Sequence, residues 1–156
     1  MSSYNEVDGV PTSGDHWLLT TQLRDEFEFK GYVTSDFGAI SGLGTVENGG
    51  HHGTCASDED CVQQFIEAGG SQNGHDFGDQ YEVHVQNLVR KGKMSMATLD
   101  RAAGAILSVK ARLGLIPGAF PETAGRWIYS SFYIVCKRTC MRVCTLRDGA
   151  CACVHV

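Results

Sequence analysis

Apolar residues recur at helical spacing in four segments of the chain. In "HWLLTTQLRDEF", Leu19, Leu23 and Phe27 repeat every four residues, which predicts a helix with one apolar face and Asp15 as its cap. A second, shorter helix is predicted after Ser57, which begins a Ser-x-x-Asp capping pattern. Its apolar residues are Val62, Phe65 and Ile66, and it stops at a pair of glycines, Gly69-Gly70.

Two further helices follow in the second half of the chain. The segment "YEVHVQNLVRKG" carries a helical apolar stripe and closes at Lys91-Gly92. The longest predicted helix is capped by Ser95 and ends at Gly114 and Pro117. Its apolar residues keep steps of three and four: Leu99, Ala102, Ile106, Val109 and Leu113.

Short extended segments separate these helices. "SSYN" is typical of the end of a strand, "GYVTSD" of a complete strand ending at Asp36, and the polar "SQNGHDFG" of a weaker third strand. "EVDGVPTSGD" and the long, Gly-rich "GAISGLGTVENGGHHGTCA" are predicted loops, the latter of a length that is usually functional or disordered. Alternation of strands and helices predicts an α/β fold with parallel strands and crossover helices.

Composition and charge narrow the possible partners. The chain has 156 residues and a formal net charge of −5, which argues against nucleic acid as a partner. It has no run of about 18 apolar residues, so we expect no membrane partner. The first ten residues lack the basic and apolar segments of a signal peptide, so either the protein is cytosolic or its true N-terminus is missing.

The last quarter of the chain differs in composition. Residues 1–116 hold 8 Lys/Arg and 16 Asp/Glu, a balance of −8, whereas residues 117–156 hold 5 and 2, a balance of +3. This shift predicts one domain over 1–116 and an irregular, poorly ordered Cys-rich tail over 117–156, with a linker near "GLIPGAFPETAG". Five of the seven cysteines lie in that tail: Cys136, Cys140, Cys144, Cys151 and Cys153.

The tail cysteines leave several interpretations open. A helix would align Cys136, Cys140 and Cys144 on one face, but the spacing is a poor match to zinc sites. Disulfides would form if the chain were secreted. A third hypothesis is that the tail is translated from a non-homologous reading frame or an unspliced segment and carries no selected chemistry.

Asp36 stands where the apolar character of its predicted strand stops, between Ser35 and Phe37 and just before Gly38. One interpretation is an ordinary turn or capping residue, because Asp is common at such positions. The other is a nucleophile at the mouth of an α/β barrel, where active sites lie at the carboxyl ends of the strands. The spacing alone leaves both open.

An ordered series of motifs resembles glycoside hydrolase family 3, the β-glucosidase and β-xylosidase group. Ser-Tyr-Asn precedes a Gly-Val-Pro turn, a helix with "LRDEFEFKG" follows, and a strand ends in Ser-Asp-aromatic. Downstream, "LVRKGKMSMATLDRAAGAILSVKARLGLI" is similar to the helical end of that family's N-terminal domain. The resemblance covers residues 1–116 and implies an incomplete (β/α)8 TIM-type barrel fragment that holds only about the last three strand–helix units.

The resemblance also implies roles for three residues. Asp36 occupies the position of the catalytic nucleophile of a retaining hydrolase of β-linked sugars. Tyr4 is similar to the tyrosine beside that nucleophile, where a phenol can donate a hydrogen bond to the carboxylate. Phe37 stands where the family commonly has Trp, and its ring would offer an apolar platform to a sugar. A β-linked glycoside is therefore the expected substrate, and we expect no cofactor.

Other polar residues are given no role at the site. Asp76 and Glu47 have no spacing that supports an acid partner and are expected to be ordinary surface carboxylates. The adjacent His51 and His52 lie in a Gly-rich loop without matching ligands, so we expect them to be solvated and predict no metal site.

The chain departs from the family pattern upstream of residue 1. The family's other sugar-binding residues and its general acid have no counterpart here, so this chain alone is expected to hydrolyse almost nothing. One alternative is a non-catalytic fragment that binds sugar or another protein, and the other is a structural role for the Cys-rich tail.

Overall fold

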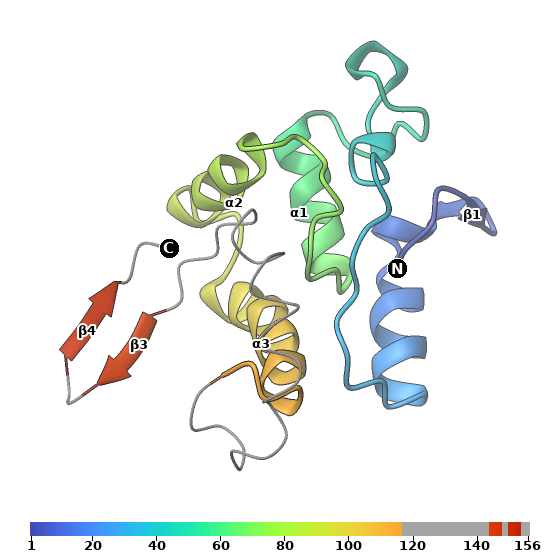
Figure 1. Ribbon diagram of the computed structural model, residues 1–156. Helices are drawn as coiled ribbons and strands as arrows, with labels where there is room; N and C mark the ends of the chain where they lie inside the picture. The colour runs from blue at the N-terminus through green and yellow to red at the C-terminus, as the bar shows by residue number, and fades with distance from the viewer. Residues whose placement is uncertain (117–143, 148–149, 154–156) are drawn as a thin grey trace. The chain divides into compact units, whose positions relative to one another are not determined.

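The computed structural model describes residues 1–116, 144–147 and 150–153. The chain divides into two compact units, Met1–Val109 and Lys110–Val156. The described residues contain three α-helices: α1 (Asp58–Ala68), α2 (Gln80–Arg90) and α3 (Met96–Arg112) (Figure 1). In the first unit α1 contacts α2, and it also contacts a helical segment near the N-terminus, η2 (Trp17–Glu26).

The predicted helices and their caps are confirmed. The side chains of Asp15, Ser57 and Ser95 each accept a hydrogen bond from the backbone amide three residues ahead, at 3.1, 3.2 and 3.1 Å. These bonds satisfy amides that have no partner within the first turn of a helix. At the other ends, Gly69 follows α1 with a φ of 125° and Gly92 follows α2 with a φ of 68°, conformations that favour glycine.

The N-terminal helix differs from the prediction in its winding. Segment η2 is a π-type helix, and after its end the amide of Phe27 bonds the carbonyl of Gln22, five residues back, at 3.0 Å. Leu19 is 6 % exposed, but Phe27 is 74 % exposed. The predicted apolar face is therefore wrong at Phe27, because five-residue bonds widen the turn and break the four-residue spacing.

The predicted loop near residue 8 contains a small hairpin. Strands β1 (Glu6–Val7) and β2 (Val10–Pro11) pair antiparallel, with Val7 opposite Val10. The two turn residues, Asp8 and Gly9, have φ values of 51° and 80°. Two consecutive left-handed residues are typical of a type I′ turn, whose twist matches that of the strands it joins.

The three predicted parallel strands lie side by side but do not form regular strands in the described residues. The Ser2 amide donates to the Thr34 carbonyl at 2.8 Å, and Thr34 forms a parallel bridge with Gln72. The Ser35 amide donates to the Gln72 carbonyl at 2.9 Å. The α/β order of segments is thus present, and the incomplete barrel fragment stays a prediction. Residues 71–74 are Ser, Gln, Asn and Gly, which contribute little side-chain packing to a sheet.

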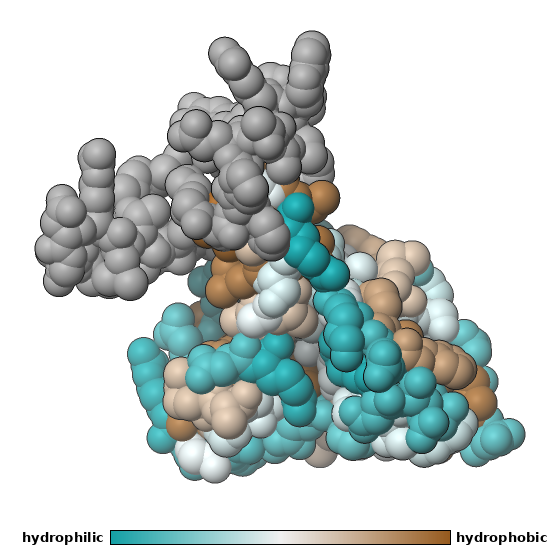
Figure 2. All heavy atoms as spheres, turned by 90° about the horizontal axis from the view of Figure 1, so that it is seen from below, coloured by the Kyte–Doolittle hydropathy of each residue, from teal (hydrophilic) through white to brown (hydrophobic). Residues whose placement is uncertain are grey.

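The core of the first unit surrounds α1. Phe65, Ile40 and Leu88 have no measurable exposure and belong to one cluster of buried residues. A second cluster joins Leu19, Val33 and Ala68. Other apolar side chains are exposed, and Figure 2 shows hydrophobic residues reaching the surface beside hydrophilic ones on the face seen from below.

A disulfide between Cys55 and Cys61 fastens the long loop to α1, with 5.2 Å between the Cα atoms. Both cysteines are buried, and Cys55 also forms a parallel bridge with Gly44. No motif in the sequence predicts this pairing.

We expect the double variant Cys55→Ser/Cys61→Ser to lower the free energy of unfolding by about 2 kcal/mol, because the disulfide restricts the unfolded chain. Urea denaturation followed by circular dichroism would measure the change. Adding a reductant should destabilise the unmodified chain but leave the double variant unchanged. Equal stability of the two proteins under oxidising conditions would contradict the prediction.

The second unit contains a pair of strands in the tail. Strands β3 (Cys144–Arg147) and β4 (Ala150–Cys153) pair antiparallel, with Cys144 opposite Cys153. The expectation of an irregular tail is therefore wrong for these residues. Cys144 lies in a strand and not in the helix that would align it with Cys136 and Cys140, which lie outside the described residues. None of the helices in the described part of the chain combines the length and apolar character needed to cross a bilayer.

Candidate functional site

Asp36 lies directly after the extended segment that ends at Ser35, and it is half-buried. One of its carboxylate oxygens accepts a hydrogen bond from the Phe37 amide at 2.7 Å, and its carbonyl accepts one from the Ala39 amide at 3.1 Å. Gly38 has a φ of 77°, so the chain turns sharply here. Asp36 thus starts a turn at the carboxyl end of its segment, which agrees with the predicted position.

Tyr4 lies beside Asp36 although 31 residues separate them in the sequence. Its hydroxyl donates to the carbonyl oxygen of Phe37 at 2.6 Å. The pKa of the Tyr4 phenol is raised, first by partial desolvation and then by the negative charges of Asp36 and Asp76. The hydroxyl thus donates to the Phe37 carbonyl and not to the Asp36 carboxylate, the partner that the resemblance implies. The phenol therefore stays protonated in neutral solution and remains a hydrogen-bond donor at the site.

Phe37 is 66 % exposed and forms an aromatic pair with His75. The two rings are stacked, with their centroids 5.8 Å apart. No motif in the sequence marks His75 as part of the site. An exposed ring next to a carboxylate can pack against the apolar face of a sugar.

Asp76 contradicts the expectation of a surface carboxylate, because it is only 2 % exposed. One carboxylate oxygen accepts hydrogen bonds from the amides of Ile40 and Ser41, at 3.1 and 2.9 Å, and the other accepts from the Ser35 hydroxyl at 3.2 Å. Burial raises the pKa of Tyr81 in α2, and the negative charge of Asp76 raises it further. No motif marked Asp76, because its partners lie 35 to 41 residues away in the sequence.

His52 is also not solvated, contrary to the prediction. Its side chain is 9 % exposed, with Nδ1 2.8 Å from a carboxylate oxygen of Glu6 and Nε2 2.9 Å from the carbonyl oxygen of Tyr4. It therefore ties the long loop to the residue that lies beside Asp36. His51 and Glu47 are exposed as expected. No group of three or more His, Cys, Asp or Glu side chains in the described residues is placed to hold a metal ion.

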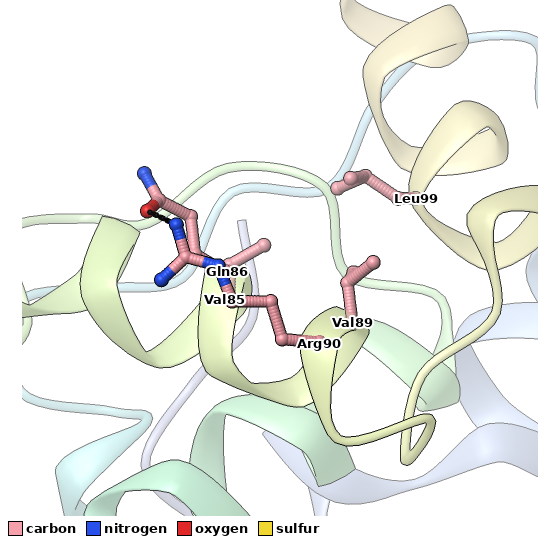
Figure 3. Close-up of a pocket in the computed structure, with 5 residues that line it drawn as sticks. All are labelled: Val85, Gln86, Val89, Arg90 and Leu99. Carbon is pink, nitrogen blue, oxygen red and sulfur yellow. Dashed lines mark hydrogen bonds between the residues drawn. The ribbon is translucent and has the colours of Figure 1, made fainter.

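A small apolar pocket lies between α2 and α3, and it does not include the predicted site residues. Its lining residues are Val85, Gln86, Val89, Arg90 and Leu99 (Figure 3). Arg90 donates to the Gln86 side-chain oxygen at 3.3 Å, so these two polar groups satisfy each other. The candidate site is therefore located by Asp36 and its neighbours and not by this pocket.

A protein-family model matches most of this chain. Residues 1–109 match the model of the glycosyl hydrolase family 3 N terminal domain. The chain belongs to this family, whose members among the relatives found include β-glucosidases and β-xylosidases.

Two relatives and one solved structure illustrate the similarity. The periplasmic β-glucosidase of Salmonella typhimurium is 39 % identical over 115 residues, which cover 74 % of this chain and 14 % of that protein. The probable β-D-xylosidase 7 of Arabidopsis thaliana is 35 % identical over 118 residues, or 76 % of this chain and 14 % of that protein. A β-glucosidase from Listeria innocua, solved in complex with glucose, is 30 % identical with a TM-score of 0.64, and the match covers 78 % of this chain and 16 % of that one.

The chain thus spans about one seventh of the length of these curated relatives. The matched region includes the segment that carries Asp36 and Tyr4. The remainder of each relative has no counterpart in the 156 residues.

Proposed function

We propose that this chain is part of a retaining glycoside hydrolase that acts on β-linked glucosides or xylosides, with Asp36 as the nucleophile. The observation that carries the proposal is the position of Asp36 at the carboxyl end of an extended segment, beside the Tyr4 hydroxyl and the exposed ring of Phe37. The activities named for the family relatives give the substrate class.

The proposed reaction has two steps. A carboxylate oxygen of Asp36 bonds to the anomeric carbon while the bond to the leaving oxygen breaks, and that oxygen takes a proton from a general acid. Water then attacks the same carbon, releases the Asp36 carboxylate and gives its proton to the same group acting as a base. Tyr4 orients the site through its hydrogen bond to the Phe37 carbonyl, and Phe37 offers its ring to the substrate.

The general acid is expected to come from outside residues 1–116. Asp76 is a buried carboxylate that already accepts hydrogen bonds from Ser35, Ile40 and Ser41. General acid catalysis typically contributes about 10²–10⁴-fold to the rate. The isolated chain is therefore proposed to turn over ordinary glycosides very slowly, whereas a substrate with a good leaving group does not need the acid.

A fluorosugar that traps the covalent intermediate tests the nucleophile directly. Incubation with 2,4-dinitrophenyl 2-deoxy-2-fluoro-β-D-glucoside should give a single adduct, which peptide mass mapping places on Asp36. Asp36→Asn should give no adduct, and Glu47→Gln, which removes an exposed carboxylate, should be labelled like the unmodified chain. An adduct on another residue, or equal labelling of Asp36→Asn, would refute the assignment.

A further inference from the structure

The loop that carries Asp36 is held at both ends by one side chain. Before Asp36, the Ser35 hydroxyl donates to Asp76 at 3.2 Å. After Asp36, the amides of Ile40 and Ser41 donate to the other oxygen of Asp76, at 3.1 and 2.9 Å. The Asp76 carboxylate therefore bridges the two ends of the turn on which Asp36 stands.

The segment around Asp76 is shaped to direct this carboxylate inward. Asn73 binds the backbone of Asp76 twice, because its side-chain oxygen accepts from the Asp76 amide at 2.6 Å and its side-chain nitrogen donates to the Asp76 carbonyl at 2.7 Å. On either side, His75 and Phe77 have φ values of 81° and 59°, a left-handed conformation that is unfavourable for such residues. Strained residues of this kind persist only where surrounding contacts fix them, and they cluster at functional sites.

The two segments also approach each other too closely for a larger residue. A Cβ atom on Gly74 would overlap the carbonyl group of Ser35. The Gly74 amide donates to the Ser35 hydroxyl at 2.7 Å, and that hydroxyl in turn donates to Asp76. Ser35 thus joins the strand end before Asp36 to the segment that holds Asp76.

The chemistry of these contacts requires an acceptor at residue 76. Both backbone amides and the Ser35 hydroxyl act as donors, and a carboxylate can accept from all of them. An asparagine keeps one acceptor oxygen, which suffices for Ile40 and Ser41, whereas an alanine keeps none. The two variants therefore separate the loss of an acceptor from the loss of a charge.

We propose that Asp76 is a positioning residue that holds the Ser35–Ser41 loop, and through it the Asp36 carboxylate, in the orientation for attack on the sugar. The part that concerns attack rests on the proposed function of Asp36. Misplacement of a reacting group by about 1 Å can cost about 100-fold in rate, so a side chain that fixes this loop has a measurable effect on chemistry.

The first measurement is amide hydrogen exchange by NMR on the full 156-residue chain. In Asp76→Ala, we expect exchange at the amides of Ile40 and Ser41 to accelerate at least about tenfold, because they lose their acceptor. The amide of Phe65, inside α1, should change less than about twofold, which shows that the core remains folded. Asp76→Asn should retain most of the protection at Ile40 and Ser41.

The second measurement is the rate at which the activated fluoroglucoside labels Asp36. Asp76→Ala should be labelled about 100-fold more slowly than the unmodified chain, and Asp76→Asn less than about tenfold more slowly. Asp79→Ala is the matched control, because it removes an exposed carboxylate from the same segment. The Asp79 side chain makes no capping hydrogen bond to α2. It should be labelled at the rate of the unmodified chain.

The two measurements have separate consequences. Unchanged exchange at Ile40 and Ser41 in Asp76→Ala would overturn the proposal, and so would equal labelling rates for Asp76→Ala and the unmodified chain. An adduct on a residue other than Asp36 would instead overturn the nucleophile role of Asp36. The exchange rates would still decide whether Asp76 holds the loop, since they do not depend on any reaction.

Discussion

Asp36→Asn is expected to lower glycoside hydrolysis by at least about 1,000-fold in a chimera that supplies the missing part of the enzyme. In this chimera, residues 1–109 replace the matching segment of the periplasmic β-glucosidase of Salmonella typhimurium, which is 39 % identical in this region. An amide does not form the covalent glycosyl intermediate, so the barrier should rise by about 4 kcal/mol or more. The measurement is kcat/KM for p-nitrophenyl β-D-glucoside.

Two further variants of the chimera make this result specific. Glu47→Gln should keep the rate of the unmodified chimera, because Glu47 is exposed and lies outside the group around Asp36. Asp36→Gly leaves space in place of the carboxylate, so azide should restore product formation with a dinitrophenyl β-glucoside, and the product should be the α-glycosyl azide. Retention of activity within tenfold in Asp36→Asn would show that Asp36 is not the nucleophile.

The helices could be predicted because their signals are local. A cap and its amide lie three residues apart, as for Ser57 and Ser95, and the apolar stripes repeat within one helix. The hairpin at Asp8-Gly9 also had a local signal, since Asp-Gly between two valines is typical of a type I′ turn. That signal was available in the sequence but was interpreted as an ordinary loop.

The contacts that shape the candidate site could not be predicted from local signals in the sequence. His52 meets Glu6 from 46 residues away, and Asp76 meets Ser35 from 41 residues away. Neither spacing has a periodicity or motif that predicts it, because these residues come together only in the folded chain. The roles proposed for Asp36 and Tyr4 come only from the resemblance to a family and not from their spacing.

The predicted parallel strands are irregular in the structure for a different physical reason. A strand in a parallel sheet gains its hydrogen bonds from neighbours on both sides, and such sheets are normally covered by helices on both faces. Here the central segment bonds Ser2 on one side and Gln72 on the other, each through only one or two residues. The order of the segments is therefore encoded within residues 1–116, whereas regular strand geometry is expected to require the rest of the barrel.

Phe65→Ala is expected to lower the free energy of unfolding by about 3–5 kcal/mol, the range measured for removal of a fully buried aromatic ring. Phe65 has no measurable exposure and belongs to the same buried cluster as Ile40, Leu43 and Leu88. Urea denaturation followed by circular dichroism would measure the loss. Phe27→Ala is the matched control, because Phe27 is 74 % exposed and its removal should change stability by less than about 0.5 kcal/mol.

The comparison of these two phenylalanines tests whether the first unit has a core of its own. If residues 1–109 fold around α1 without the rest of the barrel, removing the buried ring must lower the free energy of unfolding far more than removing the exposed one. Unfolding must also remain cooperative. Similar small losses for both variants, with a broad transition, would mean that the cluster around Phe65 is not firmly packed in this chain. The Asp36 loop would then lack support, because Ile40 and Leu43 hold its far end in that same cluster.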